Sequence, residues 1–170
     1  MAKKNNKEAA NDLENGQCNG REAIQQAVLN ITSAAKREYI IMGPVLDPRI
    51  FNRPEFIEAL TTFVTGHPRN ITKILIENSN QVINENGRLI TLCRRLSENL
   101  RIRTMPEEYQ GQSDLFLVAD NETLLFQKSI SSPVAIVTKA DKTVAAPYKR
   151  RFDYAWQHSI PVPGLHTLGL

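Results

Sequence analysis

Residues 113–120 read SDLFLVAD and residues 123–126 read TLLF, so two apolar runs stand almost end to end. The first run, residues 115–119, is continuous and apolar, which is typical of a strand that is buried on both faces of a sheet. The residues between the runs, 120–122, read DNE, and Asp and Asn favour tight turns. This stretch therefore predicts a β-hairpin whose first strand lies in the core.

The rest of the chain alternates between helical and strand patterns. Segments in which apolar residues recur every three or four positions predict amphipathic helices, and short continuous or alternating apolar runs predict strands. The third helix is interrupted by Asn86-Gly87, which predicts a kink or a join between two helices. Helices are expected at 21–37, from Pro54 onward, at 80–98 and from Pro147 onward, and further strands at 39–42, 71–76, 100–103 and 134–137.

This order predicts an α/β domain with a mixed, largely parallel sheet flanked by helices. Helical crossovers produce parallel strands, and the hairpin adds an antiparallel element. The domain is expected to span residues 20–170, with the tail at 161–165 extended against the sheet. Residues 1–19 are rich in Lys, Asn, Glu and Ala and have few large apolar groups, which predicts a disordered arm.

The hairpin stretch resembles the catalytic motif of phospholipase D-like enzymes, which is His-x-Lys-x-x-x-x-Asp on a buried strand followed by a second apolar strand. Asp120 stands at the Asp position of that motif, whereas Ser113 stands at the His position and Leu115 at the Lys position. Residues 151–159, RFDYAWQHS, are similar to a Phe-x-x-x-Trp-x-x-Ser helix near the end of each half of such enzymes. The element order from Arg21 onward is similar to one such half, as found in small bacterial domains.

The resemblance implies a single half that lacks its catalysts. In the family the His attacks phosphorus, and the Lys neutralises charge on the phosphoryl oxygens. Ser113 is a poor nucleophile without an adjacent base, and Leu115 has neither a charge nor a donor. Active enzymes pair two motifs, so a lone half suggests a homodimer. A simpler interpretation explains the same residues: the strand at 115–119 is only a core strand and Asp120 begins a turn.

Three functions remain open on this sequence. The favoured one is a non-catalytic binding or protein-interaction module. The second is nucleic-acid binding, and the third is residual phosphodiesterase activity. The candidate anion contacts are five basic residues on two predicted elements: Arg101, Arg103, Lys149, Arg150 and Arg151. A net charge of only +3 and an aromatic content of 6% do not favour nucleic-acid binding.

Other reactive residues do not combine into a site. The three histidines and two cysteines lack metal-ligand spacing, and no glycine-rich phosphate-binding loop is present, so we expect no metal and no cofactor. Cys93 is expected to be a small buried hydrophobe, and Glu107 and Glu108 to be solvated loop charges. No apolar run approaches the ~20 residues of a membrane span, and no apolar segment follows the basic start. We therefore expect a cytoplasmic protein.

Overall fold

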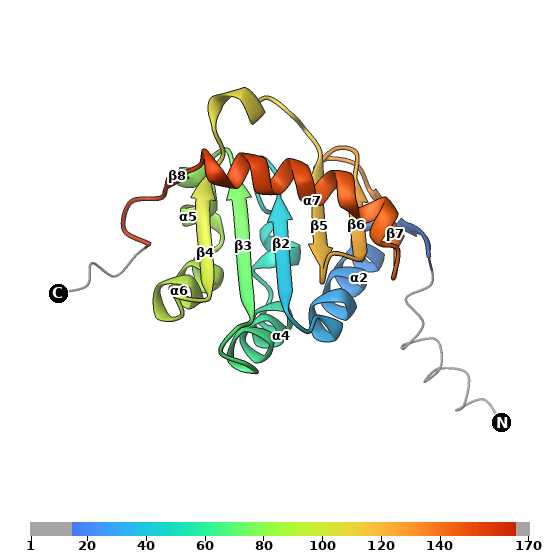
Figure 1. Ribbon diagram of the computed structural model, residues 1–170, viewed down its shortest axis with the longest axis horizontal. Coiled ribbons are helices and arrows are strands. Elements are labelled where there is room, and N and C mark those ends of the chain that lie inside the picture. Colours follow the sequence, from blue (N-terminus) through green and yellow to red (C-terminus); the bar gives the residue numbers. More distant parts are fainter. Residues whose placement is uncertain (1–14, 166–170) are drawn as a thin grey trace.

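Eight strands form one sheet in the order β1-β7-β6-β5-β2-β3-β4-β8 across residues 15–165, the part of the chain that this computed structural model describes (Figure 1). The strands are β1 (Gly16–Asn19), β2 (Glu38–Met42), β3 (Ile71–Ile76), β4 (Leu100–Thr104), β5 (Leu115–Ala119), β6 (Thr123–Gln127), β7 (Val134–Thr138) and β8 (Ile160–Pro161). The sheet includes the predicted hairpin, because β5 and β6 pair antiparallel with Ala119 opposite Thr123.

Helices lie on both faces of the sheet (Figure 1). Most of them pack on one face, and a single long helix crosses the strands on the other face. The helices are α2 (Arg21–Ala34), α3 (Pro48–Phe51), α4 (Pro54–Thr65), α5 (Ser79–Glu85), α6 (Gly87–Arg95) and α7 (Lys142–Gln157), with a 3₁₀ turn η1 (Glu107–Tyr109). The long helix is α7, and the interruption predicted at Asn86-Gly87 is a join between α5 and α6.

The mixed sheet flanked by helices is confirmed, but the expected excess of parallel pairs was wrong. Only β2–β3 and β3–β4 are parallel in the described region, and the remaining pairings are antiparallel. Helical crossovers connect the parallel strands. By contrast, β5, β6 and β7 follow one another through short loops, which only antiparallel strands can use. The edge strands β1 and β8 are also antiparallel to their neighbours.

Each central strand contributes to two cores, because successive side chains of a strand point to opposite faces. In β2, Tyr39 and Ile41 join the core beneath α2, α4, α5 and α6, and Ile40 and Met42 join the core beneath α7. All four side chains are at most 2% exposed. Burial on both faces explains why the central strands have continuous apolar sequences.

Part of the predicted disordered arm is ordered in the structure. Residues Gly16–Asn19 form β1, which pairs with β7, and the Gly20 N–H donates to the carbonyl of Pro133 at 2.7 Å. Cys18 packs against the larger core. The arm prediction was therefore wrong for these residues, since pairing with β7 compensates for their polar composition. Residues 1–14 lie outside the described region.

The last helix begins earlier than Pro147, where the sequence predicted its start. α7 begins at Lys142, and the carboxylate of Asp141 caps it by accepting the backbone N–H groups of Thr143 and Val144 at 3.1 and 3.2 Å. Pro147 costs one intrahelical hydrogen bond. The helix persists because its buried face, which includes Phe152, packs against the sheet.

The chain after α7 returns to the sheet, as predicted for the extended tail. β8 pairs with β4, and Val162 and Leu165 are each 1% exposed within the larger core. No helix in the described range is both long and apolar enough to cross a membrane.

Candidate functional site

Strand β5 carries the residues that the sequence aligned with the catalytic motif. All five of its residues are buried. Leu115, Leu117 and Ala119 belong to the core beneath α2, and Phe116 and Val118 belong to the core beneath α7. Ser113 precedes the strand and Asp120 follows it. The structure therefore brings Ser113 and Leu115 to one end of β5 and places Asp120 at the other.

Leu115 is the residue that the sequence aligned with the lysine of the resembled motif. Its side chain is 3% exposed and lies against Gly43, the residue that follows β2. A Cβ atom added to Gly43 would be 2.9 Å from Cδ1 of Leu115, closer than real Cβ contacts come. The two residues thus close this end of the strand by packing, and Leu115 is buried rather than open to a ligand.

Ser113 lies exposed on the surface at the same end. Its carbonyl oxygen accepts the Ile130 N–H at 2.8 Å, which fastens it to the β6–β7 loop. That loop holds a hydroxyl pair, with Ser129 Oγ and Ser131 Oγ 2.9 Å apart. Within residues 15–165 no histidine or carboxylate is hydrogen-bonded to the Ser113 hydroxyl. A serine without such a base remains a weak nucleophile.

Asp120 performs a structural task at the opposite end of β5. Its carboxylate accepts three consecutive backbone N–H groups, those of Lys36 at 2.9 Å, Arg37 at 2.7 Å and Glu38 at 3.1 Å. Asp120 and Asn121 have φ angles of 55° and 61°, in the left-handed region that Asp and Asn tolerate. Asp120 therefore forms the hairpin turn, as the simpler interpretation predicted, and also fastens it to the segment between α2 and β2.

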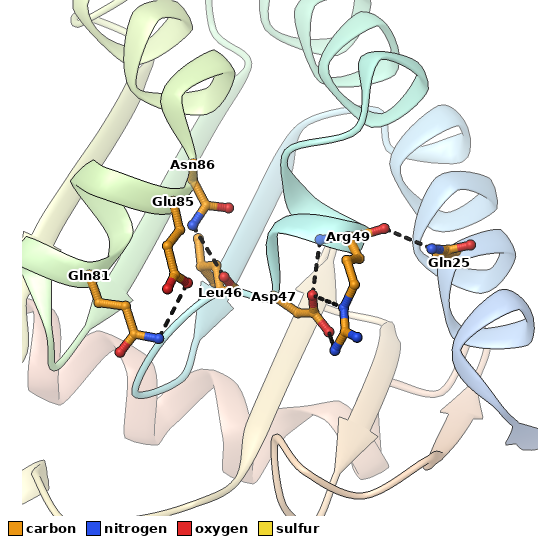
Figure 2. A network of polar contacts seen from close by, with 7 residues as sticks. All are labelled: Gln25, Leu46, Asp47, Arg49, Gln81, Glu85 and Asn86. Carbon is orange, nitrogen blue, oxygen red and sulfur yellow. Dashed lines mark hydrogen bonds and ion pairs between the residues drawn. The ribbon is translucent and has the colours of Figure 1, made fainter.

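A network of polar contacts holds the loop that follows β2, next to the end of β5 where Leu115 lies (Figure 2). Asp47 caps α3 and forms a two-point ion pair with Arg49, with both N–O distances 3.0 Å. Burial alone would raise the pKa of Asp47, but the hydrogen bonds and charge of Arg49 and the charge of Arg21 hold it below its ordinary value. Gln25 on α2 donates to the Arg49 carbonyl at 2.7 Å.

The same network reaches the join between α5 and α6 (Figure 2). Asn86, which is fully buried, donates from Nδ2 to the Leu46 carbonyl at 3.1 Å. Asn52 at the end of α3 accepts the Arg88 N–H at 2.8 Å and so caps α6. These contacts tie the loop after β2 to α2 and to the α5–α6 join. The loop borders a cavity of about 190 Å³.

Two larger cavities lie near the other end of β5, on either side of the C-terminal half of α2. One, of about 480 Å³, borders Asp120, and the other, of about 660 Å³, lies between α2 and α4. They share four lining residues: Asn30, Ser33, Ala35 and Lys36. Sequence reasoning missed both cavities, because no motif marks them. No group of three or more His, Cys, Asp or Glu side chains suited to a metal ion occurs in the part of the chain that is described.

Two of the five predicted anion contacts are neutralised within the protein. Lys149 forms ion pairs with Glu38, at 3.1 Å, and with Asp153. Burial would lower the pKa of Lys149, but its hydrogen bonds to these two carboxylates raise it above its ordinary value. Arg151 pairs with both carboxylate oxygens of Asp114 at 2.8 and 3.2 Å. These residues lie in the middle of α7 rather than at its start.

The other predicted cations lie on the α7 side of the sheet or on α7 itself. Arg103 donates from Nε to Ser159 Oγ at 2.6 Å and from Nη2 to the Ser159 carbonyl at 2.8 Å. Its guanidinium also lies 5.6 Å from the ring centroid of Trp156. Arg101 is exposed on the same strand face, and Arg150 is exposed on α7. The sequence prediction missed Lys73, although the alternation along β3 places it on this face beside Arg101.

Comparison with known proteins agrees with this architecture. The family described as Domain of unknown function (DUF7931) matches residues 20–168. No curated protein matches the sequence. The structure is similar to Nuc, a phospholipase D family member from Salmonella typhimurium, with a TM-score of 0.57 and 18% identity over 79% of this chain and 88% of that chain.

Two further solved structures share the fold. NucT from Helicobacter pylori gives a TM-score of 0.58 and 10% identity over 83% of this chain and 92% of that chain. TrmBL2, an archaeal chromatin protein whose structure shows a mode of DNA binding, gives 0.62 and 19% identity over 95% of this chain. The present chain spans 63% of the TrmBL2 chain. At these identities the likeness identifies a phospholipase D-like fold and nothing finer.

Proposed function

This chain belongs to the family Domain of unknown function (DUF7931) and has a phospholipase D-like fold, and on that premise we propose that it is a non-catalytic binding module. The observation that carries the proposal is the buried Leu115, which packs against Gly43 where the motif requires a lysine. A leucine cannot neutralise charge on a phosphoryl oxygen. Ser113, at the histidine position, has no hydrogen-bonded base among the residues that the structure describes.

The contacts of Asp120 are compatible with the same proposal. The spacing of the motif along one strand already puts its Asp at the end opposite its first two reactive residues, so the position of Asp120 alone does not separate an active motif from an inactive one. Here the carboxylate is engaged by three backbone N–H groups and fastens a turn to the start of β2. Asp120 therefore has a structural role that would be kept in a protein without catalytic activity.

The test is a sensitive turnover assay on activated phosphodiesters and on DNA, with the wild-type chain and Ser113→Ala side by side. The proposal predicts no turnover above background and no difference between the two proteins. Turnover by the wild-type chain that Ser113→Ala abolishes would overturn it and favour residual phosphodiesterase activity.

The same proposal includes a homodimer. Phospholipase D-like enzymes pair two halves, and this chain covers 88% of the Nuc chain and 92% of the NucT chain, so it corresponds in size to nearly all of each. Light scattering coupled to size exclusion should give twice the 19.2 kDa mass of the chain. A mass of 19.2 kDa at all accessible concentrations would remove the dimer from the proposal.

Nucleic-acid binding is the second candidate function. It is favoured by the likeness to TrmBL2 over 95% of this chain and by the cations that the structure places on the α7 side of the sheet. Fluorescence anisotropy of labelled DNA and RNA at low and moderate salt tests it. Binding that weakens as salt rises would support this candidate. Absence of binding at low salt would leave a protein partner as the working assignment.

A further inference from the structure

We infer that one surface binds the phosphate backbone of nucleic acid: the cationic face, formed by Lys73 on β3 and Arg101 and Arg103 on β4. The inference rests on nucleic-acid binding as the candidate function and assigns that binding to the cationic face. The cationic face is the part of the sheet next to the C-terminal half of α7, where Trp156 lies between the helix and the strands. It is separate from the ends of β5 and from the cavities around α2.

The first argument is electrostatic. Lys73 and Arg101 are directly paired in the register of β3 and β4, so their side chains stand next to each other on one face of the sheet. Arg103 follows two residues later on that same face. Within residues 15–165 none of the three forms an ion pair with a carboxylate, although Lys149, Arg151 and Arg49 all do. Neighbouring like charges repel, and a bound polyanion would relieve that repulsion.

The second argument is preorganisation. Ser159, which is 8% exposed, accepts two hydrogen bonds from Arg103 and so fixes its guanidinium. Within residues 15–165, Nη1 of Arg103 forms no hydrogen bond to the protein. The Trp156 ring also contacts Lys73, whose Nζ lies 5.5 Å from the ring centroid. The ring is itself held by stacking on Phe152, with the two ring centroids 5.7 Å apart. Donors that are held in place lose less entropy on binding, so each contact contributes more affinity.

The spacing of the cations favours a polymeric ligand. None of the cavities described above is lined by Lys73, Arg101 or Arg103. A long polymer with a charge at every unit can contact several neighbouring cations at once. The Trp156 ring is already occupied by Phe152 and by the two cations, so we expect backbone contacts and little base selectivity.

The experiment compares two double variants that remove the same charge. Lys73→Gln/Arg101→Gln removes two cations of the cationic face, and Arg69→Gln/Arg95→Gln removes two exposed cations elsewhere, on the α4–β3 loop and on α6. Each protein is titrated into labelled single-stranded and double-stranded oligonucleotides across a salt series. The first variant should bind about tenfold or more weakly, and its salt slope should fall by about two. The second should stay within about twofold of wild type.

Each other outcome overturns the inference. If the wild-type chain binds and both variants weaken it equally, net charge alone is responsible, and the candidate function survives without this surface. If the wild-type chain does not bind at low salt, the candidate function fails as well. If polyglutamate of matched charge competes as well as the oligonucleotide, the surface binds acidic polymers generally and is not specific for nucleic acid.

Folding of the variants is checked separately by thermal unfolding. Removing Lys73 and Arg101 relieves repulsion but also removes the contact of Lys73 with the Trp156 ring, so this variant should melt close to the wild-type temperature. If the double variant does not fold, the exposed Arg101→Gln alone is used, with Arg95→Gln as its control. The salt slope should then fall by about one for Arg101→Gln and remain unchanged for the control.

Discussion

The two ends of strand β5, which the sequence aligned with one motif, make different contacts in this structure. At the N-terminal end, Leu115 is buried against Gly43, and Ser113 is exposed with no hydrogen-bonded base within residues 15–165. At the C-terminal end, Asp120 accepts three backbone N–H groups. One end is closed by apolar packing, and the other holds a carboxylate that fastens a turn. The presence of Asp120 is therefore explained by its structural contacts alone.

The largest expected effect comes from a charge placed at the closed end. Leu115→Lys would bury an ammonium group at a position that is 3% exposed and has no partner carboxylate, at a cost of about 4 kcal/mol in unfolding free energy. Leu115→Met, which keeps the volume and the apolar character, should cost less than about 1.5 kcal/mol. Denaturant unfolding measures both variants.

The result for Leu115→Lys also decides how the restored motif is interpreted. The variant Ser113→His/Leu115→Lys carries the two reactive residues of the phospholipase D-like motif, and we expect it to be destabilised by a similar amount and not to cleave a phosphodiester. A stable Leu115→Lys protein would show that the closed end can open, and the contrast between the two ends of β5 would then be wrong.

The next largest effect is expected at the other end of the strand. Asp120→Ala leaves the N–H groups of Lys36, Arg37 and Glu38 without their acceptor and puts alanine at a φ of 55°. We expect a loss of about 3 kcal/mol in unfolding free energy. Asp120→Asn keeps the turn and one acceptor oxygen and should cost about half as much. Equal stability of wild type and Asp120→Ala would remove the structural role assigned to this carboxylate.

A smaller effect tests the contact between Gly43 and Leu115. Gly43→Ala should cost about 1 kcal/mol, because the new methyl group would meet Leu115 Cδ1 at 2.9 Å and the leucine must shift. In a Leu115→Ala background the same change should cost nothing or stabilise the protein, because it fills the space that is left. A double-mutant cycle that shows no coupling would mean that the two residues do not close this end together.

The smallest effect is expected for Ser113→Ala. The Ser113 contact to Ile130 uses its backbone carbonyl, and the side chain is exposed, so unfolding free energy should change by less than about 0.5 kcal/mol. Thermal unfolding of this variant against wild type provides the measurement. A loss above about 1 kcal/mol would indicate that the hydroxyl has a structural contact which this account does not include.

Local sequence patterns predicted the positions of helices and strands more successfully than the pairing of the strands in the sheet. The strand at 71–76 and the hairpin were correctly predicted from runs of apolar residues, because burial on both faces leaves a direct trace in sequence. The balance of parallel and antiparallel pairs depends on which strands meet, and no local pattern records that. β1 is the clearest case, since its four polar and small residues form a strand only because β7 lies beside them.

The candidate site was predictable only in part. The alternation along β4 correctly placed Arg101 and Arg103 on one face, and the alternation along β3 could have added Lys73. The ion pairs of the α7 cations could not be predicted, because the partners of Lys149 and Arg151 include Glu38 and Asp114, which are far away in sequence. The cavities around α2 also depend on tertiary packing alone.

The most direct test of the account is intact-protein mass spectrometry after incubation with an activated aryl phosphodiester. A reactive nucleophile would displace the aryl alcohol and keep the remaining phosphoryl ester on its own oxygen or nitrogen. The account predicts that the wild-type chain keeps its unmodified mass even at long incubation, because Ser113 has no hydrogen-bonded base in the described part of the chain and Leu115 carries no charge. A phosphoryl adduct that maps to Ser113 and disappears in Ser113→Ala would contradict it.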